Sequence, residues 1–184
     1  MTPDSARVSA TFFASAFEYY VAGRFAVLAG LSPVPGNLMH HAIELGLKGA
    51  LTLKGASLAE LKPYGHNLPR LWYAFKAQHR APSFDHFDEV VFKLQAFEDL
   101  RYPDAVLSQA LQVELKNVKP GTGLALANTG ERSSYELDLS DIDALMGEVL
   151  HAARQDAKSY TGRFHGAARQ YLVDDNSVAE LTAV

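Results

Sequence analysis

The chain has 184 residues, a formal net charge of −4 and no cysteines. This length fits a single domain, and the lack of cysteines excludes disulfides, thiolate metal sites and a cysteine nucleophile. The negative net charge excludes a global basic field for non-specific nucleic-acid binding, so any contact with RNA has to come from a local patch.

Nothing in the N-terminal residues predicts a targeting segment. MTPDSARVSATFF carries Asp4 early and lacks the basic segment and apolar run of a signal peptide. The longest apolar run, from Phe25 to Leu31, is far shorter than the roughly 20 residues that span a bilayer. We therefore expect a cytoplasmic protein without a membrane partner.

The first part of the chain predicts two long helices. Apolar residues recur at spacings of three and four from about Ser5 to Leu28, which places them on one helical face. A stretch rich in glycine and proline then breaks the helix. Asn37 is predicted to cap a second helix, which extends to about Lys54 and stops at Gly55.

Two shorter helices are predicted next. Asn67 is the expected cap of the third helix, in which Pro69 is tolerated in the first turn. Pro103 ends the fourth helix, because a proline disfavours helical backbone in the residue before it. The apolar stripes of these two helices are Leu68, Leu71, Trp72 and Phe75, and Phe87, Val90, Val91, Leu94 and Phe97.

The middle of the chain changes to a period of two. Apolar and polar residues alternate in LQVELKN, which begins at Leu111, and in SYELDLS, which begins at Ser134. The connecting segment is rich in glycine and other turn-forming residues. These features predict a small β-hairpin inserted at about residues 110–139.

A last long helix is predicted after this insertion. The residues from Ser140 to Asp143 resemble a capping box, and a helical apolar stripe continues to Ala153. We expect this helix to pack against the first one. The sequence therefore predicts a mainly all-α domain over residues 1–162, a four- to five-helix bundle, followed by a C-terminal tail over residues 163–184. The last part of this tail, DDNSVAELTAV, is expected to be loose or to depend on a partner for its structure.

Strong catalytic motifs are missing from the sequence. It contains no phosphate-binding P-loop, no G-x-S-x-G nucleophile elbow and no H-E-x-x-H zinc motif. The two Glu-x-x-His pairs of a di-iron bundle are also not found. We therefore expect no metal and no cofactor.

A polar stripe on the second predicted helix is the first candidate site. His40, Glu44 and Lys48 follow one another at spacings of four, and His41 is adjacent. A carboxylate one turn from an imidazole and an ammonium can position both and raise the imidazole pKa, which suits proton transfer or phosphate binding. A solvated helix face has the same pattern, and we favour that structural interpretation.

His66 and Asn67, in YGHNLPRL, are the second candidate. Helix capping explains Asn67, but no helix rule requires His66. Two interpretations of His66 remain open. Its imidazole either donates to a carbonyl or carboxylate of the second helix, or it faces an anion site at the N-terminus of the third helix.

Arg101 and Tyr102 close the fourth predicted helix in FEDLRYPDA. An arginine at this position is favourable against the helix dipole. The alternative is that Arg101 turns inward and pairs with a carboxylate such as Glu44.

The segments HAIELGLKGALTLKG, YGHNLPRL and FEDLRYP resemble the HEPN superfamily of small helical-bundle proteins, including members near phage-abortive and nucleotidyltransferase-linked systems. The resemblance covers about Ser9 to Pro103 and, more loosely, Ser140 to Tyr160. It implies a HEPN-type bundle that forms a homodimer, with RNA, a nucleotide or a partner protein approached from the dimer cleft. The setting would be phage defence or a toxin–antitoxin system, with a nucleotidyltransferase-type partner.

Many HEPN proteins are metal-independent ribonucleases in which a histidine follows an arginine after four to six residues. Arg80 and His86 have this spacing, but Pro82 places them in a helix connection and Ala81 replaces the usual polar residue. Arg101 has no histidine at this spacing. The resemblance therefore implies binding without catalysis, with two alternatives. One is a metal-independent endoribonuclease that uses Arg80 and His86, or Arg101 with a histidine from another helix or subunit. The other is a purely structural association subunit.

Overall fold

The computed structural model describes most of the chain, namely residues 3–31, 34–79, 84–98, 112–116 and 134–182. The described part is mainly helical, as the sequence predicted. None of the helices described is both long and apolar enough to cross a lipid bilayer.

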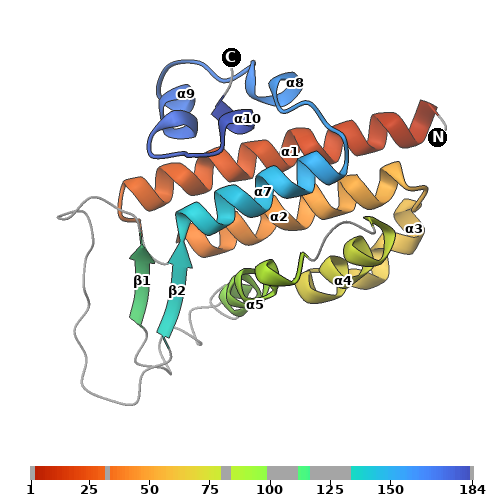
Figure 1. Cartoon of the computed structure of the whole chain (residues 1–184), viewed down its shortest axis with the longest axis horizontal. Helices are drawn as coiled ribbons and strands as arrows, with labels where there is room; N and C mark the ends of the chain where they lie inside the picture. The colour runs from red at the N-terminus through yellow and green to blue at the C-terminus, as the bar shows by residue number, and fades with distance from the viewer. Residues whose placement is uncertain (1–2, 32–33, 80–83, 99–111, 117–133, 183–184) are drawn as a thin grey trace.

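Two long helices, α1 (Pro3–Leu28) and α2 (Val34–Leu53), lie side by side, and the other elements pack around them (Figure 1). Their facing sides carry the apolar stripes that the sequence predicted. These side chains are fully or almost fully buried, and burial of each such side chain contributes about 1.5–3 kcal/mol. They include Phe13, Phe17, Tyr20, Met39, Ile43 and Leu47.

The start of α2 differs from the prediction. Proline is tolerated in the first turn of a helix, so α2 begins at Val34 and includes Pro35. Asn37 therefore lies inside the helix and does not cap it. Gly36 faces Phe97, where an added Cβ would lie 1.9 Å from the aromatic ring, so only glycine allows this close approach.

The next helices cover the side of α2 that faces away from the C-terminal segment (Figure 1). The short helices α3 (Leu58–Leu61) and η1 (Lys62–Tyr64) lead into α4 (Leu68–His79). The predicted cap of α4 is confirmed, because Asn67 Oδ1 accepts a hydrogen bond from the Arg70 amide at 3.0 Å.

The fourth predicted helix comprises η2 (Phe84–Phe87) and α5 (Asp88–Ala96). It packs against both α2 and α4. The Trp72 indole donates to Asp88 Oδ1 at 2.6 Å, which joins α4 to the start of α5.

The two predicted strands are present, as β1 (Gln112–Lys116) and β2 (Ser134–Asp138). They pair in parallel, with Gln112 opposite Ser134 and Lys116 opposite Asp138. The predicted hairpin is therefore wrong, because a hairpin requires antiparallel strands. The connection over residues 117–133 is longer than the roughly dozen residues that a parallel crossover needs.

The last long helix, α7 (Leu139–Ala152), packs closely against α2. Its cap is Asp138, whose Oδ1 accepts from the Ser140 amide at 2.9 Å, so the predicted capping box is misplaced. Asp143 instead points into the core with no exposed area. It accepts hydrogen bonds from the Tyr20 hydroxyl at 2.6 Å and from the Arg24 guanidinium, and these contacts join α7 to α1.

The C-terminal segment is not a loose tail, so that prediction is wrong. It forms α8 (Lys158–Thr161), α9 (Gly166–Val173) and α10 (Ala179–Thr182), which lie beside α1 (Figure 1). Within it, Leu172 and Leu181 are fully buried in the common core.

A buried arginine holds the C-terminal segment against α1. Arg24 Nε donates to the Tyr171 carbonyl at 2.7 Å, and a second nitrogen of the same guanidinium donates to the Asp174 carbonyl. These acceptors are backbone carbonyls, so the side chains of Tyr171 and Asp174 could not have predicted the contact with Arg24.

Replacement of Arg24 by methionine should strongly destabilise the fold. The Arg24→Met variant leaves the buried Asp143 carboxylate without its cation, which costs about 3–5 kcal/mol. For a chain of this size the melting temperature should fall by about 6–20 °C in a calorimetric scan.

The matched control is Arg7→Met. Arg7 pairs with Asp4 on the surface, where their side chains are 81% and 90% exposed. The substitution should therefore leave the melting temperature almost unchanged. Equal melting temperatures for the two variants would contradict the role of Arg24.

Candidate functional site

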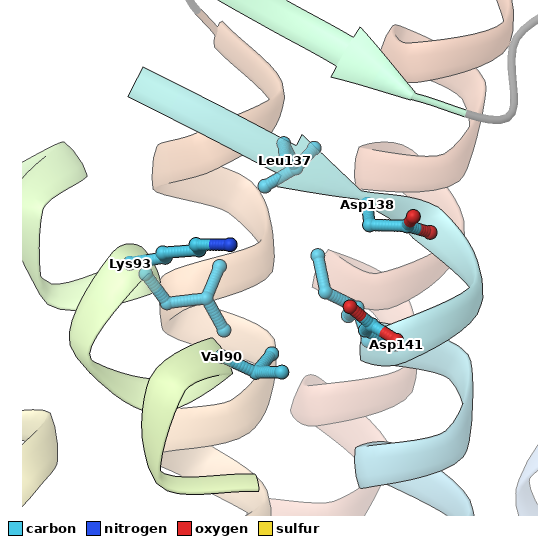
Figure 2. A pocket seen from close by; sticks show the side chains of 7 residues that line it. Val90, Lys93, Leu137, Asp138 and Asp141 are labelled. Atoms are coloured by element: carbon cyan, nitrogen blue, oxygen red, sulfur yellow. The ribbon is translucent and has the colours of Figure 1, made fainter. Parts of the chain in front are cut away.

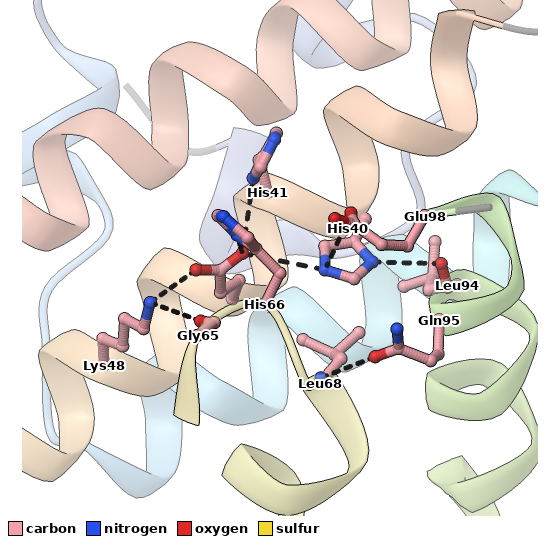
Figure 3. Close-up of polar contacts among 10 residues, drawn as sticks. His40, His41, Lys48, Gly65, His66, Leu68, Leu94, Gln95 and Glu98 are labelled. Atoms are coloured by element: carbon pink, nitrogen blue, oxygen red, sulfur yellow. Dashed lines mark hydrogen bonds and ion pairs between the residues drawn. The ribbon is translucent and has the colours of Figure 1, made fainter. Parts of the chain in front are cut away.

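The Glu44 carboxylate is the centre of a polar cluster between α2 and the loop before α4. Its side chain is only 3% exposed. Glu44 Oε2 lies 3.3 Å from His41 Nδ1 and 3.0 Å from His66 Nδ1, while Glu44 Oε1 accepts a hydrogen bond from Lys48. Figure 3 shows these side chains converging on one point. The stripe is therefore buried against the loop before α4 and is not the solvated helix face that we expected.

The loop between η1 and α4 brings His66 to this cluster. Gly65 has a φ of 55°, in the left-handed region that favours glycine, and turns the chain toward α2. Lys48 Nζ donates to the Gly65 carbonyl at 2.9 Å. Lys48 thus holds the loop and the carboxylate at the same time.

The contacts of His66 decide between its two interpretations. Its imidazole faces the Glu44 carboxylate of the second helix and so fixes the position of the loop. The first amides of α4 are already used, because the Leu68 amide donates to Gln95 Oε1 at 2.7 Å and the Arg70 amide donates to Asn67. The alternative of an anion site with free amides at this helix end is therefore not supported.

Electrostatics keep Glu44 ionised. Burial alone would raise its pKa, but hydrogen bonds from His41, Lys48 and His66 outweigh burial and lower the pKa to about 2. The carboxylate therefore carries its negative charge throughout the physiological range, and its two oxygens act as acceptors only.

His40 lies deeper in the same cluster and has no exposed area. Its Nδ1 lies 3.1 Å from the Leu94 carbonyl, so this nitrogen carries the proton and donates. Its Nε2 points toward two carboxylates, with Glu44 Oε2 at 3.6 Å and Glu98 Oε2 at 3.9 Å. Burial lowers the pKa of His40, which favours the neutral imidazole with a lone pair on Nε2.

Other predicted site residues do not join this cluster. Arg80, Arg101 and Tyr102 lie outside the described residues, so the predicted pairing of Arg101 with Glu44 stays a prediction. His86 lies in η2, where it is exposed and its ring centre is 4.0 Å from that of Phe87.

Sequence reasoning missed two residues at this site. Tyr19 of α1 is 39% exposed, and its ring centre lies 5.3 Å from that of His41. Glu98 follows α5 and approaches His40. Neither has a spacing relation to the stripe on α2, so only the packing of three separate helices could reveal them.

A small hollow lies between α5, the end of β2 and the start of α7, and Figure 2 shows its lining. Val90 and Lys93 face Leu137, Asp138 and Asp141 across it. The enclosed space is about that of one water molecule. It is therefore too small for a ligand, and the Glu44 cluster is the stronger candidate.

Comparisons with family models, with characterised proteins and with solved structures found no match to this chain. The interpretation of the site therefore depends on its own geometry. A buried carboxylate surrounded by three imidazoles and an ammonium can position donors, hold a proton or hold a cation.

Removal of the Glu44 charge should destabilise the protein. In the Glu44→Gln variant, the buried donors lose an ionised acceptor whose pKa shift from 4.5 to about 2 corresponds to about 3 kcal/mol. Chemical denaturation at pH 7 should show a loss of this size. The control is Glu89→Gln, because Glu89 and Lys93 have the same spacing as Glu44 and Lys48 but Glu89 is 76% exposed.

The difference between the wild type and Glu44→Gln should depend on pH. A carboxylate with a depressed pKa stabilises the folded state above its unfolded pKa of about 4.5, and this contribution is lost as pH falls toward 2. The difference should therefore shrink by about 2 kcal/mol between pH 5 and pH 3. A constant difference over this range would show that Glu44 is not held as described.

Proposed function

We propose that this chain is a homodimeric HEPN-like protein that binds RNA or a nucleotide, without cleaving it, at the loop that leads into α4. The observation that carries the proposal is a basic and aromatic surface on this loop, formed by Lys62, Tyr64, His66 and Arg70 and called here the α4 loop surface. The side chains of Lys62, His66 and Arg70 are exposed, and Tyr64 is half-buried.

The α4 loop surface has groups for both parts of a nucleotide. The Arg70 guanidinium lies 5.5 Å from the ring centre of Tyr64, so a planar cation and an aromatic ring are adjacent. Unstacked bases are bound on such aromatic and guanidinium planes. Lys62 and Arg70 supply positive charge for the phosphates.

Charge compensation around the loop leaves this surface positive. Glu60 is the nearest acid in the sequence, and its carboxylate is held by Ser57 at the start of α3. Its single negative charge is outnumbered by the positive charges of Lys62 and Arg70. Lys48 and Glu44 compensate each other below the loop. The remaining charges of Lys62 and Arg70 act over about 8–10 Å, so the overall charge of −4 on the chain does not cancel them locally.

The resemblance to HEPN proteins supports the remaining parts of the proposal. The homodimer, the nucleotidyltransferase-type partner and the setting in phage defence or a toxin–antitoxin system are inferred from this resemblance. Cleavage is left out, because the Arg80 and His86 motif departs from the family pattern and Arg80 lies outside the described residues.

Loss of charge on the α4 loop surface should weaken RNA binding. We expect the double variant Lys62→Gln/Arg70→Gln to bind a fluorescein-labelled single-stranded RNA roughly tenfold more weakly at low salt, because two phosphate contacts are lost. The slope of log K against log salt should also become shallower by about 1.4. Fluorescence anisotropy in EDTA measures both quantities.

The charge-matched control is Arg154→Gln/Lys158→Gln, at the end of α7 and the start of α8, where both side chains are exposed. It should bind RNA as the wild type does. Equal affinities for the two double variants, or no binding by the wild type, would refute the proposed function.

The same proposal predicts a dimer in solution. Sedimentation equilibrium at micromolar concentration should give twice the mass of 20.1 kDa. A monomer under these conditions would remove the homodimer from the proposal while leaving the RNA experiment unaffected.

A further inference from the structure

We propose that His41, Glu44 and His66 bind one divalent transition-metal ion of the zinc(II) class, with the buried His40 facing the same carboxylate. This site shares His66 with the α4 loop surface and does not depend on RNA binding. It also departs from our expectation from the sequence, which contains no standard metal-binding motif.

The spacing of three ligand atoms suits such an ion. His41 Nδ1, His66 Nδ1 and one Glu44 oxygen all lie within 4.8 Å of one another. The two distances to Glu44 Oε2 are 3.3 and 3.0 Å. Ligands about 2.1 Å from one ion lie about 3.0–3.4 Å apart at angles from octahedral to tetrahedral. Both distances to Glu44 Oε2 therefore match one coordination sphere, and the third pair of ligand atoms, the two imidazole nitrogens, lies within 4.8 Å.

The orientation of His40 is an independent indication of a cation. Its Nε2 is buried and makes no hydrogen bond among the described residues, although it points toward Glu44 Oε2 at 3.6 Å. Because its Nδ1–H donates to the Leu94 carbonyl, the neutral form of His40 turns its Nε2 lone pair toward a carboxylate lone pair, which is repulsive. A cation bound to Glu44 Oε2 would remove this repulsion.

The surroundings have the hydrogen bonds that support metal ligands. The hydrogen bond from His40 Nδ1 to the Leu94 carbonyl fixes the direction in which the His40 ring faces Glu44. Lys48 binds the second oxygen of Glu44 and leaves Oε2 for the ion. In the bound state, His41 and His66 would carry their protons on Nε2 and give their Nδ1 lone pairs to the ion.

The donor set determines the class of metal. Two imidazole nitrogens and one carboxylate oxygen suit zinc(II) and its neighbours in the first transition row. Magnesium(II) and calcium(II) prefer oxygen ligands and fit this set poorly. The side chain of His66 is 50% exposed, so the ion could be reached from solvent on that side.

Titration of the full chain with metal tests this site. Protein stripped with EDTA and exchanged into chelator-free buffer is titrated with zinc(II) by calorimetry and with cobalt(II) by visible absorption. We expect one ion per chain, with no competition from millimolar magnesium(II). The His66→Ala variant should bind zinc(II) at least about 100-fold more weakly, because loss of a ligand exceeds the effect of losing its supporting partner.

The control is His165→Ala, because His165 is exposed and makes no capping hydrogen bond at the start of α9. It should bind zinc(II) like the wild type, and circular dichroism should show that both variants are folded. Absence of zinc(II) binding by the wild type, or equal affinity in His66→Ala, would overturn the site. RNA binding in EDTA is a separate readout, so failure of one proposal is distinguishable from failure of the other.

Discussion

The structure depends most on how one buried carboxylate is compensated. An ionised group that is 3% exposed is costly unless donors surround it, and Glu44 has donors from two different elements. His41 and Lys48 come from its own helix, whereas His66 comes from the loop before α4. The contacts of His66 with Glu44 and of the Gly65 carbonyl with Lys48 fix the position of the loop, and the loop determines where α4 begins.

The Glu44 cluster also affects the positions of α4 and α5. α4 carries Trp72 and Phe75 into the core, and Trp72 also contacts the start of α5 through Asp88. His40 connects the same cluster to α5 through the Leu94 carbonyl. The cluster thus joins α2, the loop before α4, and α5 with polar contacts. On α1, Arg24 has the same role, because it joins α7 and the C-terminal segment to that helix.

Local patterns predicted the elements well and their partners poorly. Helical spacing identified α1, α2, α4, α5 and α7, and Asn67 was a correct cap because its contact is only three residues away. The parallel pairing of β1 and β2 was missed, since alternation along a strand carries no information on its direction relative to a neighbour. The C-terminal helices were missed because α9 and α10 are too short to show a clear period.

The site was only partly predictable for the same reason. Spacings of four placed His40, Glu44 and Lys48 on one stripe, but spacing cannot show whether a stripe faces solvent or a neighbouring element. Burial of Glu44 and the inward direction of His66 come from tertiary packing. Asp143 was assigned to a capping box because acidic residues near a helix start usually cap it, whereas here the residue pairs with a buried arginine on another helix.

The protonation of two imidazoles tests the central claim most directly. If Glu44 Oε2 accepts from His41 and His66, both rings must carry a proton on Nδ1 in metal-free protein. Long-range ¹H–¹⁵N correlation spectra of chelator-treated, ¹⁵N-labelled protein distinguish a protonated Nδ1 from an unprotonated one. The account predicts a proton on Nδ1 of both residues. An unprotonated Nδ1, with the only ring proton on Nε2, would show that the carboxylate does not hold the loop.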